Sequence, residues 1–128
     1  MAFSDDRETF TATISASGSL SAAVPLGGKA LVGIMMAATG SGDFDANTVS
    51  LQFNVSMDGT TYELLKDNDG SLVKVVVAEN NTLGATHLAP DKFAAWRFVK
   101  ISTHKADEAV QAQTAKTEFT LITAKVTG

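Results

Sequence analysis

The segment Val49–Ala78 reads VSLQFNVSMDGTTYELLKDNDGSLVKVVVA and decides the fold class of this chain. Alternate positions from Val49 to Val55 are apolar, which is typical of a strand with one face on a core and the other in water. The dipeptides Asp58-Gly59 and Asp69-Gly70 separate this run from two further strand-like runs. Because glycine readily adopts the positive φ of a tight turn, the segment predicts consecutive hairpins.

Strand-like runs continue on both sides of this segment, with turn residues between them. Lys29–Met36 is almost wholly apolar, which predicts a strand buried on both faces, and Gly33 within it indicates a bulge or a close approach. No long amphipathic helix occurs, so the pattern predicts an all-β, antiparallel β-sandwich, jelly-roll-like, with eight or nine strands. The expected strands are 9–15, 20–24, 29–36, 49–55, 60–65, 71–78, 85–88, 96–102 and 117–126, with a helical turn within 89–95.

Length and composition indicate one globular domain. The chain has 128 residues, of which 45% are hydrophobic and 19% charged. We expect a polar, acidic N-terminal arm over residues 1–8 and a single sandwich domain over residues 9–128. There is no cysteine, and the net charge is −4 without a basic stripe. These features predict no disulfide and no nucleic-acid binding, and the lack of a long apolar run or a signal segment predicts no membrane insertion.

Residues suited to catalysis do not fall into a known pattern. His87 and His104 lack the spacing of a zinc site, and we expect His87 to pack at a strand end. The run Asp67–Gly70 places its glycine too early for an EF-hand loop. Neither a G-x-S-x-G elbow nor a phosphate-binding glycine loop occurs. The sequence therefore predicts no enzyme, no cofactor and no metal site.

Two sets of aromatic residues leave alternatives open. Trp96, Phe98 and Tyr62 fit either the core or an exposed platform for a sugar ring. Phe44, in the loop 37–47, fits either a ring tucked onto the domain or an anchor for a partner.

Several short segments together carry a family resemblance. They are Leu26–Gly28 before the strand Leu31–Ile34, then LQFNVSMDGTTY at Leu51–Tyr62, LAPDKF at Leu88–Phe93, and RFVKI at Arg97–Ile101. In this order the segments resemble a family of small virion β-sandwich proteins of tailed bacteriophages, similar to capsid decoration (cement) proteins. The resemblance spans residues 25–126 and supplies no catalytic residue.

The resemblance implies a structural protein on the capsid surface of a virion, assembled in the host cytoplasm. Its expected partner is the major capsid protein, which it would bridge and stabilise, and it would form a homo-oligomer, with a trimer as one form. A carbohydrate-binding module for host adhesion and a tail or neck component are the alternatives. The contact residues expected from exposure are Phe3, Asp5, Asp6, Arg7, Phe44, Lys105, Asp107 and Glu108.

Overall fold

The computed structural model describes residues 2–36, 44–77 and 84–127, and gives the backbone alone for residues 2–6 and 126–127. Strands make up 50% of the described residues and form two antiparallel sheets, which confirms the all-β sandwich. The described residues contain nine strands, as expected, while jelly-roll connectivity stays a prediction. No helix in these ranges has the length and apolar character needed to span a membrane.

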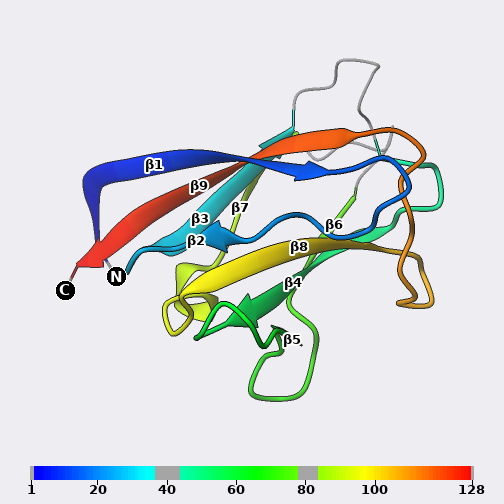
Figure 1. The fold of residues 1–128 in the computed structure, drawn as a ribbon. Helices are drawn as coiled ribbons and strands as arrows, with labels where there is room; N and C mark the ends of the chain where they lie inside the picture. The colour runs from blue at the N-terminus through cyan, green and yellow to red at the C-terminus, as the bar shows by residue number, and fades with distance from the viewer. Residues whose placement is uncertain (1, 37–43, 78–83, 128) are drawn as a thin grey trace.

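The first sheet, called sheet A, contains four strands in the order β1, β9, β3, β7 (Figure 1). Their bounds are Ala2–Ile14 for β1, Thr117–Thr127 for β9, Ala30–Met36 for β3 and Gly84–His87 for β7.

The pairing of β1 with β9 runs from Ala2 opposite Thr127 to Ile14 opposite Thr117. Residues 2–8 of the predicted arm continue β1 in the structure, with a shift in the register against β9 between Phe3 and Arg7. The polar side chains of this segment do not prevent pairing, because backbone groups make the ladder.

The second sheet, called sheet B, follows the order β2, β8, β4, β5, and β6 also pairs with β4. Its strands are Val24–Pro25 for β2, Phe98–His104 for β8, Ser50–Ser56 for β4, Glu63–Leu64 for β5 and Lys74–Val76 for β6.

The short strands β5 and β6 lie along the same edge of β4. Val55 pairs with Glu63, and Leu51 pairs with Val75. Between them a small hairpin projects, closed by the bridge from Lys66 to Leu72. Gly59 and Gly70 have φ values of 79° and 90°, which confirms positive φ at both Asp-Gly turns.

The inner faces of the two sheets form one hydrophobic core. Sheet A contributes residues such as Ile14, Leu31 and Leu121, and sheet B contributes Leu51 and Ile101, all fully buried. Each such side chain stabilises the fold by about 1.5–3 kcal/mol on burial.

The predicted helical turn is present as η2 (Pro90–Lys92), directly before Phe93. Phe93 enters the core and contacts Phe53 edge to face, with the ring centroids 4.9 Å apart.

Gly33 accounts for an irregularity in β3. The register of β3 against β9 shifts between Leu31 and Gly33, and a Cβ on Gly33 would lie 3.3 Å from Cδ1 of Ile122. Both the bulge and the close approach are confirmed. The prediction that β3 is buried on both faces is wrong at Met35, which is 43% exposed, because this side of sheet A faces solvent.

Candidate functional site on the outer face of sheet B

Four polar residues on the outer face of sheet B are buried although they point away from the core. Ser50 lies opposite His104, and Gln52 lies opposite Ser102, on the strands β4 and β8. None of the four is more than 4% exposed. A polar side chain that leaves water must find hydrogen-bond partners within the protein.

The cover over these residues is the turn that follows β8. Lys105 N donates to the carbonyl of Ala109 at 2.8 Å, and Glu108 N donates to the carbonyl of Lys105 at 3.1 Å. After the turn, Val110 forms a bridge with His104, so the chain returns beside β8. Glu108 has φ = 70°, a left-handed conformation that a non-glycine residue holds only where its surroundings favour it.

The imidazole of His104 connects β8 to this turn. Its Nδ1 lies 2.8 Å from the carbonyl oxygen of Glu108, and its Nε2 lies 2.7 Å from Oγ of Ser102. Because a carbonyl can only accept, Nδ1 carries a proton, and in the neutral imidazole Nε2 then accepts from the Ser102 hydroxyl. Asn54 Nδ2 donates to the same Ser102 oxygen at 2.9 Å.

The Glu108 carboxylate reaches across the sheet from β8 to β6. One oxygen lies 2.8 Å from Nζ of Lys74, and the other accepts from Nε2 of Gln52. The hydrogen bond from Lys74 lowers the pKa of Glu108, its charge and the Gln52 hydrogen bond lower it further, and partial desolvation opposes the shift. Oε1 of Gln52 is buried without a hydrogen-bond partner.

A hydroxyl hydrogen-bonded to an imidazole resembles the start of a nucleophilic relay. Here, however, Ser102 and His104 are each only 4% exposed, so a substrate cannot reach the hydroxyl. Ser102 also lies within a regular strand and already accepts from Asn54. The arrangement fits a polar cluster that fixes the turn, since Ser102, His104 and Glu108 are hydrogen-bonded to one another or to their neighbours.

Exposed apolar side chains surround the polar cluster. The register places Leu20 beside Ser102, Leu64 beside Asn54 and Val76 beside Ser50, and Val110 beside His104. Val76 is 67% exposed and Val110 is 59% exposed. Of the seven large hydrophobic residues exposed in the described ranges, these four share the outer face of sheet B. We call them the apolar rim.

The expected contact residues are distributed over both sheets. Lys105, Asp107 and Glu108 come together in the turn over sheet B, where Asp107 accepts from the backbone N of Ala109 at 3.0 Å. Arg7 is exposed on β1, in the other sheet. The side chains of Phe3, Asp5 and Asp6 lie outside the described residues, although their backbone is part of β1.

Of the two alternatives for Phe44, the structure has the ring tucked onto the domain, so its choice as an exposed contact residue is not supported. Its side chain is 2% exposed and packs in the core, with its ring centroid 6.0 Å from that of Phe119. The neighbouring backbone is held by Gln113, whose Oε1 accepts from Asp45 N and whose Nε2 donates to Thr48 Oγ1. Gln113 is 1% exposed, so the segment between β8 and β9 is only partly solvated.

The sequence did not single out Gln52, Ser102 or His104 as a group. The alternation in β4 places Gln52 on a face that sequence reasoning assigns to water. The burial depends on the turn folding back over β8, which a local pattern does not encode. His87, expected to pack, is exposed, whereas His104 is buried.

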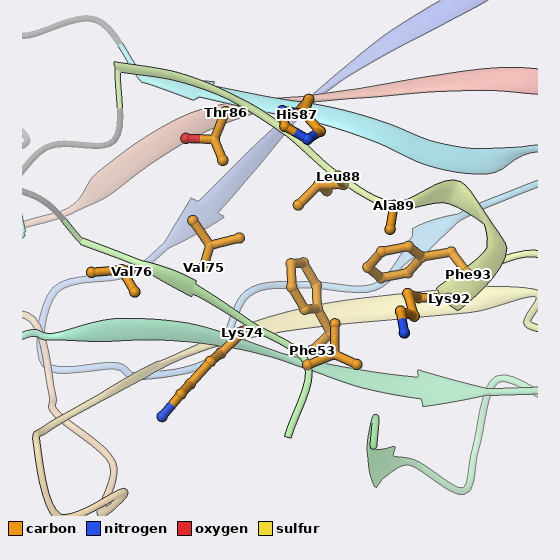
Figure 2. Close-up of a pocket in the computed structure, with 11 residues that line it drawn as sticks. Phe53, Lys74, Val75, Val76, Thr86, His87, Leu88, Ala89, Lys92 and Phe93 are labelled. Carbon is orange, nitrogen blue, oxygen red and sulfur yellow. The ribbon is translucent and has the colours of Figure 1, made fainter. Parts of the chain in front are cut away.

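Figure 2 shows a pocket at the edge of the sandwich, between β6 and β7. Its volume is about 340 Å³, and its floor is apolar, with Phe53, Val75, Leu88 and Phe93. Lys92 at its margin pairs with Asp67, which raises the pKa of Lys92 chiefly through their hydrogen bond. Residues 78–83, which join the two strands, lie outside the described ranges, and the pocket lining supplies no acid–base pair.

Both carboxylates of the Asp67–Gly70 turn have partners within the protein, Lys92 for Asp67 and the backbone of Ser71 for Asp69. Asp69 accepts from the backbone N of Ser71 at 2.9 Å, which lowers the pKa of Asp69. Among the described residues no group of three or more acidic, histidine or cysteine side chains is placed to hold a metal ion.

The aromatic residues proposed for a sugar platform are partly covered. Trp96 is half-buried and packs against the core. The ring of Tyr62 lies under Nζ of Lys100, 4.4 Å from the ring centroid. Glycan binding stays an untested alternative, because neither ring is fully buried.

Comparison of the chain with protein-family models, curated proteins and solved structures finds no match. Function is therefore inferred from the residues and from the outer face of sheet B.

Proposed function

We propose that this chain is a structural, non-enzymatic virion protein of a tailed bacteriophage, which binds the outer surface of the capsid and stabilises the shell. The motif resemblance supports this identity. The docking surface in this proposal is the outer face of sheet B, and its partner is the major capsid protein.

The apolar rim is the observation that carries the docking surface. Leu20, Leu64, Val76 and Val110 expose apolar area around polar groups that already bond one another. Covering such a face removes apolar surface from water at little cost, because few unpaired polar groups lose their hydration. A face of this kind suits a protein partner better than a small polar ligand.

The stabilisation follows from the thermodynamic linkage between binding of this chain and assembly of the shell. A protein that binds only the assembled shell shifts the equilibrium toward that shell. Many identical sites on one lattice add avidity when each copy spans neighbouring subunits. No catalytic step is required, which agrees with the inaccessible Ser102–His104 pair.

Two measurements on virions test the proposal. Quantitative mass spectrometry of purified particles should find this chain at a copy number comparable to that of the capsid protein. Particles that lack the chain should release DNA at a lower temperature. A few copies per particle would instead indicate a tail or neck component, and unchanged heat stability would remove the stabilising role.

A further inference from the structure

The strand β1 is a long edge strand in this fold. It spans 13 residues and, among the described residues, pairs with β9 on one side only. The other strands at sheet edges have two to four residues in the described ranges. Short edge strands limit pairing with other chains, whereas a long free edge offers a row of backbone donors and acceptors.

The exposed part of this edge is suited to pairing with itself. From Glu8 to Ile14 the sequence reads ETFTATI, with threonine at 9, 11 and 13. Phe10, Ala12 and Ile14 point toward the core, where Phe10 remains half-buried and the other two are buried. The threonines occupy the opposite, solvent-facing side, with Thr9 and Thr11 exposed.

Symmetry restricts how two copies of this strand can pair. In an antiparallel pair, residues directly opposite each other point to the same face. A two-fold axis through Thr11, perpendicular to sheet A, satisfies this condition. It places Thr9 opposite the partner's Thr13 and Phe10 opposite the partner's Ala12. Threonine pairs are favourable across strands, and Ala12 leaves space for the ring of Phe10.

We propose that two copies of this chain form a two-fold dimer through β1, centred on Thr11. The two sheets A then become one eight-stranded sheet, and the backbone of β1 gains partners on its free side. A second copy is the occupant that the sequence favours, because the same segment supplies the matching threonine and Phe-Ala positions. Glu8, the charged residue within the paired stretch, is held by Lys29 of its own chain.

The dimer goes beyond the proposed function and stands independently of it. Because the two-fold axis is perpendicular to sheet A, sheet B lies on the same side of the joined sheet in both protomers. The outer faces of both sheets B therefore point in the same direction. Two docking faces on one rigid unit would bind a lattice with higher avidity.

Sedimentation velocity of the purified chain, over a concentration series and without particles, tests the dimer. Wild type should sediment as a dimer that dissociates on dilution. Thr9→Lys combined with Thr13→Lys places like charges opposite each other twice. Thr9→Lys combined with Thr13→Glu places opposite charges there, and its dimer dissociation constant should be lower by about tenfold.

The matched control adds two lysines elsewhere, by Thr61→Lys with Asn68→Lys, in exposed turns of sheet B. This variant should dimerise like wild type, and circular dichroism should find all variants folded. A wild type that stays monomeric throughout the series would overturn the proposal. So would a trimer, or equal dissociation constants for the two Thr9/Thr13 variants.

Discussion

His87 and His104 lie on the outer faces of different sheets and have opposite surroundings. His87 is exposed on β7, at the edge of sheet A. His104 is 4% exposed on β8, and both of its ring nitrogens are hydrogen-bonded. The outer face of sheet A is solvated and rich in threonine, whereas a turn covers the outer face of sheet B. A position that points away from the core is thus buried wherever the chain folds back over it.

The largest effect on stability should come from replacing His104, and replacing His87 provides the comparison. His104→Ala leaves a cavity and deprives Ser102 and the Glu108 carbonyl of their partner, which should lower the free energy of unfolding by about 3 kcal/mol. His87→Ala should change it by about 0.5 kcal/mol or less, because the side chain is exposed. Urea unfolding measures both, and equal losses would remove the distinction between the two faces.

A smaller effect should follow from deleting a single hydroxyl. Ser102→Ala leaves His104 Nε2 and Asn54 Nδ2 without their shared oxygen and should destabilise the chain by about 1–2 kcal/mol. Thr11→Val removes a solvated hydroxyl on sheet A and should cost about 0.5 kcal/mol or less. Thermal unfolding at low protein concentration measures the pair. A Thr11 variant as damaging as the Ser102 variant would show that burial does not separate the two faces.

Much of the architecture was predictable because it depends on local patterns. Alternation in β4 and glycines 59 and 70 specify strands and turns within a few residues, and the structure has them. The extension of β1 to Ala2 was not predictable from alternation, because backbone pairing with β9 decides it.

The candidate site depends on contacts distant in sequence. Glu108 meets Gln52 and Lys74, which lie 56 and 34 positions away. Gln113 meets Asp45 from 68 positions away, which also brings Phe44 toward the core. A polar residue in a loop pattern, such as Gln113, gives no local sign of such burial, so the sequence alone left the position of Phe44 open.

The smallest effect should come from Glu108, which changes how stability depends on pH. Since the pKa of Glu108 is lowered in the folded chain, its contribution is complete above the ordinary value of 4.5 and is lost as pH falls through the lower folded-state pKa. Glu108→Gln should therefore make the loss of stability from about pH 5 to about pH 3 shallower.

Thermal unfolding at a series of pH values measures this pH dependence of stability. Lys74→Met removes the main cause of the lowered pKa and should give a similarly shallow slope. A slope as steep as that of wild type in both variants would contradict a role for the ion pair.

The central claim is that the outer face of sheet B docks on the capsid. Binding of the purified chain to particles that lack it tests this claim most directly. Val76→Glu alters the apolar rim, and Met35→Glu makes the same change at an exposed apolar residue on sheet A. In an equilibrium titration of particles that lack the chain, Val76→Glu should weaken binding by about tenfold or more, with Met35→Glu within about twofold of wild type. Equal affinities for the two variants, or a larger loss from Met35→Glu, would contradict the account.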